Sequence, residues 1–296
     1  MVKEIKVSVF KSAYLTDNPV QMELMDILDV IKNGDRDLNK KIKTVASESD
    51  HDKRNELKVK LLPIFLPNGV FSRRADDGLI AMNGIACIDL DDVKNPTAVR
   101  DQLKQFQSVL SIFTSPSRTG LKVLVLHDLK DPTRYRDLYY HLGTVLGVIG
   151  RNDIVFDTFC ASISKACFMS VDKDIYINEN AVPYNVPNNL PQVNLPASES
   201  RKKKNHQQQS KPNVSVLTDP GKIREQIIKE HELFEDYYSM AKGNRNNNLF
   251  ILACFFKDSG IPEDYATNYL AAYYRDPANG FTADEIKATV KSAYSS

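Results

Sequence analysis

Two aspartates end a strongly apolar run in the sequence GIACIDLDDV, residues 84–93. The side chains of a strand alternate between its two faces, so Asp89 and Asp91 point to one face and their apolar neighbours to the other. Two carboxylates about 4 Å apart repel each other by about 4 kcal/mol at an effective dielectric constant of about 20. A divalent cation relieves this repulsion, and Mg²⁺ takes one or two carboxylates together with substrate phosphates. The pair indicates a metal site, with a frayed acidic strand end as the alternative.

A polar loop with a lysine after it forms the second candidate, SPSRTGLK, residues 115–122. Its hydroxyl groups, its arginine and the close backbone approach that Gly120 permits suit a polyphosphate. Lys122 lies in the apolar strand LKVLV, where it presents a fixed positive charge on one sheet face. A plain polar hairpin explains the loop residues as well, whereas a lysine inside such a strand favours a functional role.

A third acid, Asp157, closes the short strand IVFD and is followed by Lys165. An acid at the end of a strand is common, so this signal is weak by itself.

Several other chemistries are excluded by the sequence. It has no GxxxxGK[ST] motif for a helicase motor, no HxH pair for a nicking endonuclease and no GxSxG elbow for acyl transfer. The four cysteines form no CxxC pair and the five histidines are isolated, which argues against a zinc site.

Strands and helices that alternate along residues 1–185 must position these groups. Strands are expected at 3–10, 84–92, 109–114, 121–127, 154–157 and 165–171, and helices at 20–34, 95–106 and 133–147. Asn95 as a cap with Pro96 at the first helical position marks the start of the helix at 95–106, and a Thr282/Glu285 capping box marks the start of a helix near the end of the sequence. The stretch 61–71 contains two prolines and Asn-Gly, and so predicts extended chain broken by a turn. Mixed elements with antiparallel hairpins predict an α+β domain.

The chain changes character near residue 186. Residues 186–215 are rich in Pro, Asn, Gln and Ser and carry a net charge of about +4, which predicts a flexible basic linker. Residues 216–296 contain only helical patterns and carry about −3, so they predict a small all-α domain. The amino terminus has no signal-peptide core, and no apolar run approaches the roughly 20 residues of a membrane span. A cytoplasmic protein with no membrane partner is expected.

Taken in order, these motifs resemble the archaeo-eukaryotic primase superfamily, whose motifs are DxD, SxH and a lone acid after an apolar residue. The sequence is most similar to the VirE-amino-terminal-like primase-polymerases of bacterial mobile elements and phages. The blocks that carry the resemblance are LLPIFLPNGVFSRR (61–74), GIACIDLDDV (84–93), FTSPSRTGLKVLV (113–125), VFDTFC (155–160), SKACFMSVDKDIYIN (164–178), GNRNNNLFILACFFKDSGIP and FTADEIKATVKSAY. The last two resemble the helical domain that follows the catalytic domain of many primases.

The resemblance implies a primase palm with a sheet of the RNA-recognition-motif type, flanked by helices. Asp89, Asp91 and Asp157 would then hold two Mg²⁺ or Mn²⁺ ions for nucleotidyl transfer. The triphosphate would be held by Ser115, Ser117, Arg118, Lys122 and Lys165. Contacts to nucleic acid are expected from Arg73, Arg74, Lys202, Lys203 and Arg245.

One residue departs from the superfamily pattern. The second motif usually has His where this chain has Lys122. A lysine is a point charge, so it compensates triphosphate charge but does not act as the neutral donor and acceptor that imidazole can be.

Two functions follow as hypotheses. The first is a primase-polymerase that makes or extends short strands on a single-stranded DNA template from nucleoside triphosphates, with a separate replicative helicase, in a bacterial or phage-infected cell. The second is a non-catalytic factor that binds single-stranded DNA on a primase-like palm. A Toprim-type enzyme also uses an hDxD strand, but the loop at 115–122 does not belong to that pattern.

Overall fold

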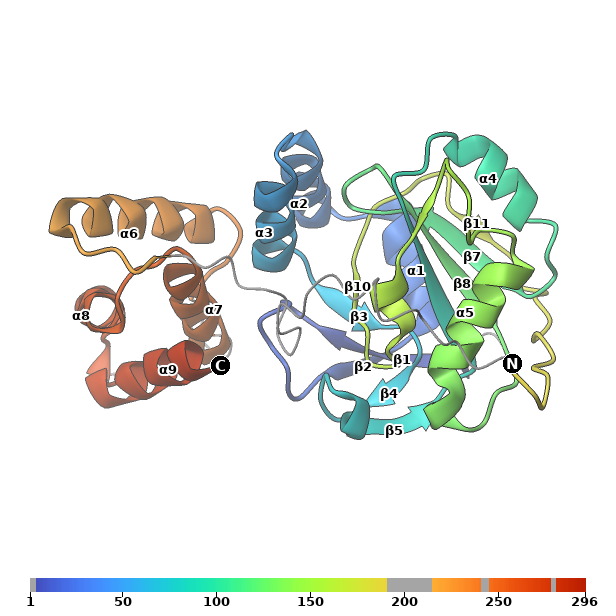
Figure 1. Ribbon diagram of the computed structural model, residues 1–296. Coiled ribbons are helices and arrows are strands. Elements are labelled where there is room, and N and C mark those ends of the chain that lie inside the picture. The colour runs from blue at the N-terminus through green and yellow to red at the C-terminus, as the bar shows by residue number, and fades with distance from the viewer. Residues whose placement is uncertain (1–3, 191–214, 241–244, 278–280) are drawn as a thin grey trace. The chain divides into compact units, whose positions relative to one another are not determined.

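The computed structural model describes residues 4–190, 215–240, 245–277 and 281–296 (Figure 1). The chain divides into two compact units, Met1–Asn194 and Leu195–Ser296. The predicted domain limits at 185 and 216 stay a prediction, because residues 191–214 lie outside the described part of the chain. None of the helices in the described ranges is long and apolar enough to cross a membrane.

Within residues 4–190, the sheet that carries the predicted motifs is a five-stranded antiparallel sheet in the order β11-β7-β8-β6-β9. Its elements are β6 (Ile85–Asp91), α4 (Pro96–Leu103), β7 (Val109–Thr114), β8 (Leu121–Leu126), α5 (Tyr135–Val145), β9 (Val155–Phe156) and β11 (Tyr176–Ile177). Elements β6 to β9 follow the β-α-β-β-α-β succession of the ferredoxin-like motif, which RNA-recognition-motif sheets share. The predicted α+β fold with antiparallel strands is confirmed.

A second, smaller antiparallel sheet has the order β10-β3-β1-β2, and the hairpin β4-β5 lies next to it (Figure 1). These strands are β1 (Lys6–Phe10), β2 (Val20–Glu23), β3 (Ile64–Leu66), β4 (Gly69–Phe71), β5 (Leu79–Met82) and β10 (Cys167–Phe168). The helices that precede β3 are α1 (Leu24–Asn33), α2 (Arg36–Ser47) and α3 (His51–Leu61). The helix expected from residue 20 begins only at Leu24, because Val20–Glu23 pair with β1 as a strand.

The central sheet is buried on both faces, which explains the nearly continuous apolar runs of β6 and β8. On one face Ala86, Ile88 and Leu90 pack with residues of α4 and α5. On the other face Ile85 and Cys87 pack with residues of β1, β3, α1 and α2. Asp89 and Asp91 continue this second row toward the end of the strand, since strand side chains alternate. The paired acids thus lie where the second core meets the end of β6.

Local capping signals in the sequence are reproduced in the structure. The Asn95 side chain accepts a hydrogen bond from the Ala98 N–H (3.1 Å) at the start of α4, with Pro96 in the first turn, as predicted. Thr282 likewise accepts from the Glu285 N–H (3.2 Å) at the start of α9.

The second unit is helical in its described residues. It consists of α6 (Pro220–Glu235), α7 (Arg245–Asp258), α8 (Glu263–Tyr274) and α9 (Ala283–Ser295). Each helix contributes apolar side chains that are almost completely buried, among them Phe234, Phe256, Leu270 and Val290. The predicted all-helical carboxy-terminal region is confirmed.

One buried histidine predicts how the first unit responds to acid. His127, just after β8, is 4 % exposed, and its Nδ1 accepts a hydrogen bond from the Leu129 N–H (3.2 Å). Burial lowers the pKa of His127 to about 4. The unfolded chain, with an ordinary histidine pKa near 6.5, therefore binds more protons between pH 6.5 and pH 4. Stability must fall as the pH drops through this window, by on the order of 3 kcal/mol from this residue.

We expect His127→Asn, which keeps an acceptor for Leu129, to flatten the dependence of the melting temperature on pH between 6.5 and 4. Thermal melts across this range provide the measurement. His51→Asn, at an exposed position of α3, is the control and should keep the wild-type slope. An unchanged slope in His127→Asn would contradict the assignment.

Candidate active site

The centre of the site is a pair of opposite charges on neighbouring strands. The register of β6 and β8 places Asp89 directly opposite Lys122, so both side chains lie on the same sheet face. Lys122 Nζ forms an ion pair with Asp89 Oδ2, and the two side chains are only 14 % and 9 % exposed. Burial lowers the pKa of Lys122, but the Asp89 carboxylate and three neighbouring cysteines together raise it by more, so the net pKa lies well above the ordinary value. Lys122 is therefore a permanent cation.

Asp157 is carried to Asp89 by the edge strand β9. Strand β9 pairs with the end of β6, and the Asp157 N–H donates a hydrogen bond to the Asp89 carbonyl (3.1 Å). The Tyr139 hydroxyl of α5 donates to the Asp157 carbonyl (2.7 Å) and accepts from the Asp89 N–H (3.4 Å). Two residues that are far apart in the sequence are thus fixed to each other through their backbones.

Cys160 lies beside the two acids, a contact that was not predicted from sequence. The 3₁₀ turn Thr158–Ala161 folds back so that the Cys160 thiol lies 3.1 Å from Asp157 Oδ2 and 3.3 Å from Asp89 Oδ2. Burial and the charge of Asp89 raise the pKa of the Cys160 thiol well above its usual value. It is a neutral S–H donor to both carboxylates. The spacing Asp157-x-x-Cys160 was a usable signal, since one turn brings residues i and i+3 together.

Asp91 lies beside this group but does not complete it. Burial raises the pKa of Asp91 to about 6, and the charges of Asp89 and Asp157 act in the same direction. Gly120 lies against this part of β6: a Cβ there would be 2.4 Å from the Leu90 carbonyl oxygen and 3.3 Å from Asp91 Oδ1. The glycine is therefore required for the loop to approach the acids.

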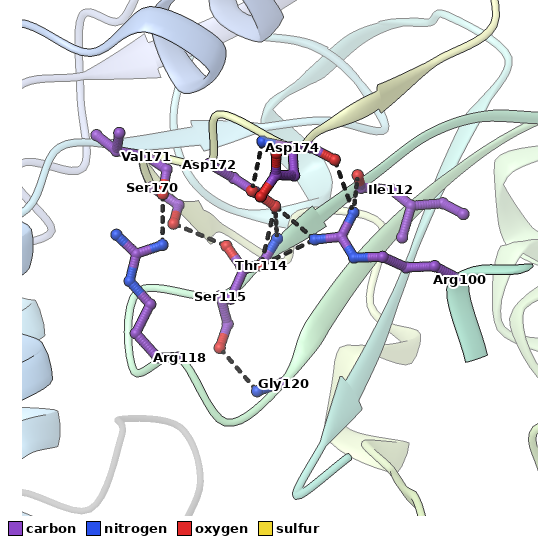
Figure 2. A network of polar contacts seen from close by, with 10 residues as sticks. All are labelled: Arg100, Ile112, Thr114, Ser115, Arg118, Gly120, Ser170, Val171, Asp172 and Asp174. Carbon is purple, nitrogen blue, oxygen red and sulfur yellow. Dashed lines mark hydrogen bonds and ion pairs between the residues drawn. The ribbon is translucent and has the colours of Figure 1, made fainter. Parts of the chain in front are cut away.

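The loop between β7 and β8 is held in shape by its own hydroxyl groups. Ser115 Oγ accepts a hydrogen bond from the Gly120 N–H (3.2 Å; Figure 2). The same oxygen lies 3.0 Å from Ser117 Oγ. Ser117 Oγ in turn lies 3.2 Å from Thr119 Oγ1. Both serines are almost completely buried. They act in the structure as supports of the turn next to Asp91.

Arg118 is bound to a backbone carbonyl of a later segment of the chain. Its guanidinium donates to the Val171 carbonyl (2.5 Å), and its backbone has a φ of 65°, a left-handed conformation that is uncommon outside glycine (Figure 2). The sequence predicts Arg118 as a triphosphate ligand, but the structure places its side chain on the segment 170–174.

The same segment is anchored by a charged network at the end of β7 (Figure 2). Asp172 accepts hydrogen bonds from the Thr114 N–H (2.7 Å), the Thr114 hydroxyl (2.9 Å) and the Arg100 guanidinium (2.5 Å). Arg100 also donates to the Ile112 carbonyl (2.9 Å), and Ser170 Oγ donates to the Thr114 carbonyl (2.7 Å). Burial by itself would raise the pKa of Asp172, but the hydrogen bonds from Thr114 and Arg100 lower it below its usual value. The network fixes the strand end from which the Ser115 loop departs.

Lys165 reaches the site from a separate segment. It lines a small cavity together with Asp89, Lys122 and Cys160. The turn before it is held by Asp76, whose Oδ1 accepts from the hydroxyls of Ser162 (2.8 Å) and Ser164 (2.5 Å). The structure thus places Lys165 and Asp89, both predicted as site residues, in the lining of one cavity.

A further lysine near the acids comes from α3. The pKa of Lys58 is lowered by burial and by the positive charge of Lys122, while Asp91 and Asp89 raise it. Lys58 Nζ donates to Asn55 Oδ1 (3.0 Å). Lys58 was not predicted from sequence, because nothing in the polar stretch around it marks which lysine faces the acids.

The residues predicted to contact nucleic acid come from different parts of the sequence. Arg73 is ion-paired with Asp77, and burial lowers the pKa of its neighbour Arg74. Arg245 lies over the Phe281 ring, 4.7 Å from its centroid, in the helical unit. Lys202 and Lys203 lie outside the described residues.

The donor groups fit a divalent cation. Among the residues that the structure describes, Asp89, Asp157 and Cys160 form a group whose potential ligand atoms all lie within 4.8 Å of one another. Asp89 Oδ1 is buried and has no hydrogen-bond partner, which is costly for a carboxylate oxygen unless it receives a cation. Asp91, predicted as a third metal ligand, lies outside this group.

Comparison with protein families gives two matches along the chain. Residues 56–177 match the BT4734-like N-terminal domain, and residues 237–296 match the Primase C terminal 1 (PriCT-1) domain. The chain has a primase-associated architecture. The first match contains Asp89, Lys122, Asp157 and Cys160, and the second contains α7, α8 and α9. Comparisons with curated proteins and with solved structures found no match.

The buried ion pair predicts a strong coupling between its two residues. Lys122→Met leaves the Asp89 charge buried without its partner, so the free energy of unfolding should fall by about 3–5 kcal/mol. The double variant Asp89→Asn/Lys122→Met removes both charges and should recover a large part of this loss. Urea denaturation of wild type, Asp89→Asn, Lys122→Met and the double variant completes a double-mutant cycle and measures the coupling energy.

Lys104→Met is the matched control, because Lys104 pairs with Asp101 at an exposed position. In this variant the free energy of unfolding should fall by less than about 1 kcal/mol. Additive losses in the Asp89 and Lys122 variants would show that the pair contributes no coupling.

Proposed function

We propose that the chain is a DNA primase-polymerase that makes or extends short strands on a single-stranded DNA template by two-metal nucleotidyl transfer. The observation that carries the proposal is the convergence of Asp89, Asp157, Lys122 and Lys165, from four separate segments, on one end of the central sheet. The PriCT-1 match in the second unit supports the same function. By its similarity to VirE-amino-terminal-like enzymes, the protein would serve replication of a bacterial mobile element or phage.

In this proposal Asp89 and Asp157 hold divalent cations, Mg²⁺ or Mn²⁺, with Asp91 at the rim of the same site. Such cations activate an attacking hydroxyl and neutralise charge on the α-phosphate of a nucleoside triphosphate. Lys122 compensates negative charge of Asp89 and of the triphosphate at the sheet face. Because its pKa is raised, Lys122 stays protonated and does not accept a proton from the attacking hydroxyl.

The triphosphate would lie between the acids and the lysines. Lys165 lines the cavity beside Asp89, and Lys58 approaches from α3, so positive charge surrounds the acids from two further elements. The Ser115–Gly120 loop brings its turn against Asp91 through Gly120. Ser115 and Ser117 act by shaping this turn, and Arg118 would have to leave the Val171 carbonyl to bind a phosphate.

The nucleic acid and a motor would be supplied from outside the catalytic centre. Arg73, Arg74 and Arg245 and the basic cluster with Lys202 and Lys203 are the candidates for contact with single-stranded DNA. The sequence contains no Walker A motif, so unwinding would come from a separate replicative helicase.

Labelled nucleotide incorporation on primed and unprimed single-stranded DNA tests the proposal. Asp157→Asn should reduce incorporation with Mn²⁺ or Mg²⁺ by about 100-fold or more, since metal-assisted stabilisation of the transition state contributes several kcal/mol. Asp157 is preferable to Asp89 for this test, because Asp89→Asn also leaves Lys122 buried without its partner.

Asp153→Asn is the matched control, an acid of the same segment that is paired with Arg151. It should keep wild-type incorporation. Equal activity in Asp157→Asn and wild type would refute the assignment of the site.

Lys165→Ala should raise the apparent KM for the nucleotide by about tenfold or more, because a charge-assisted contact contributes about 1.5–3 kcal/mol. Steady-state kinetics with varied nucleotide measure this, and kcat should change less than KM. Lys173→Ala, at an exposed position nearby, is expected to leave KM unchanged. An unaltered KM in Lys165→Ala removes this residue from the triphosphate site.

A second candidate function is a non-catalytic factor that binds single-stranded DNA on a primase-like fold. The observation that favours it is the ion pair itself, because Lys122 already neutralises the carboxylate that a cation would use. The incorporation assay separates the two functions. DNA binding by wild type without incorporation under any metal condition supports this second candidate.

A further inference from the structure

We propose that Cys160 is a ligand of the metal site, and that the set Asp89, Asp157 and Cys160 binds a thiophilic divalent cation of the zinc and cobalt class in preference to Mg²⁺. The inference rests on the proposed function for its place in catalysis, but it concerns binding and is tested by binding. A bound cation of this class would set which metals support or inhibit the reaction.

The distances between the donor atoms fit a small cation with mixed ligands. Zinc bonds of about 2.3 Å to sulfur and about 2.0–2.2 Å to oxygen put tetrahedral donor atoms roughly 3.5 Å apart. The Cys160 sulfur lies 3.1 Å from Asp157 Oδ2 and 3.3 Å from Asp89 Oδ2. These two sulfur–oxygen separations are within a few tenths of an ångström of that spacing, and the potential ligand atoms of all three residues lie within 4.8 Å of one another.

The ligand atoms are held before any cation arrives. The Asp157 N–H donates to the Asp89 carbonyl (3.1 Å), and the Cys160 N–H donates to the Asp157 carbonyl (3.3 Å). Tyr139 ties the same backbone groups from α5. Because the three residues are linked through their main chains, a cation does not have to assemble them.

A second observation points to a missing ligand. Asp89 is 7 % exposed, and its Oδ1 has no hydrogen-bond partner. Its Oδ2, by contrast, receives both Lys122 and Cys160. Besides the Oδ2 that contacts Cys160, Asp89 therefore has a second carboxylate oxygen with which it can bind a cation while Lys122 remains in place.

The sulfur decides the class of cation. Mg²⁺ takes oxygen ligands at near-octahedral geometry and keeps several waters, whereas thiolates select zinc and related transition metals. Cys160 is 5 % exposed, so its thiol is presented to the carboxylates and not to solvent. Binding would replace the thiol proton, which now lies toward the carboxylates, with the cation, and release that proton to solvent.

Titration with Co²⁺ tests the inference on the full-length protein. A cobalt–thiolate bond gives a charge-transfer absorption in the near ultraviolet. We expect this band in wild type, its loss in Cys160→Ser, and at least tenfold weaker Co²⁺ binding in Asp157→Asn. Zn²⁺ should displace the band at equimolar concentration, and Mg²⁺ should not displace it at 100-fold excess.

Two other cysteines provide matched controls. Cys167 lines the same cavity but lies outside the ligand group, and Cys254 is buried in α7. Cys167→Ser and Cys254→Ser should keep the band. A band that survives in Cys160→Ser, or that disappears in Cys167→Ser with Cys160 intact, overturns the proposal.

Zinc X-ray absorption on wild type keeps the test decisive if Cys160→Ser does not fold. One sulfur at about 2.3 Å together with oxygen ligands supports the proposal, and a shell without sulfur overturns it. The two assays distinguish failure of the proposed function from failure of the ligand inference. Cobalt–thiolate absorption without nucleotide incorporation leaves the ligand inference standing, whereas incorporation without the absorption refutes only the inference.

Discussion

The ion pair between Asp89 and Lys122 is the interaction on which the site depends. It joins β6 and β8 near one end of the sheet, and the register of these strands admits no slip, because a shift of either strand by one residue would send the charge of that strand to the opposite, apolar face. A buried charge without a partner is strongly destabilising. The strand sequence IACIDLD is therefore compatible with this fold only while Lys122 stands opposite, and that requirement fixes where the loop between β7 and β8 must end.

The other groups of the site are attached to this pair by backbone contacts. Strand β9 and the Tyr139 hydroxyl bring Asp157 to Asp89, and the following 3₁₀ turn returns Cys160 to both. Gly120 allows the Ser115 loop to lie against Leu90 and Asp91. The result is a group of acids and lysines whose charges nearly balance, and whose least satisfied atom is a single carboxylate oxygen of Asp89.

In this arrangement, two residues that were predicted from sequence as phosphate ligands also have structural contacts. Lys122 was expected to face a triphosphate, but its nearest charge is Asp89, so it stabilises the sheet as well as any ligand. Arg118 was expected to bind phosphate, but it donates to the Val171 carbonyl and helps to hold the segment that Asp172 anchors. Cys160 and Lys58, by contrast, were not chosen. The spacing Asp157-x-x-Cys160 was overlooked, and one lysine among many carries no distinctive pattern.

The sequence by itself determined the fold class and most elements around the candidate site. Alternation in GIACIDLDDV placed two acids on one strand face, Asn95 and Thr282 announced helix starts, and the apolar runs predicted an α+β unit followed by helices. Only the tertiary structure decided which groups meet. Register, the edge position of β9 and the turn after Asp157 depend on contacts between residues far apart in the chain, and local periodicity carries no information about those contacts.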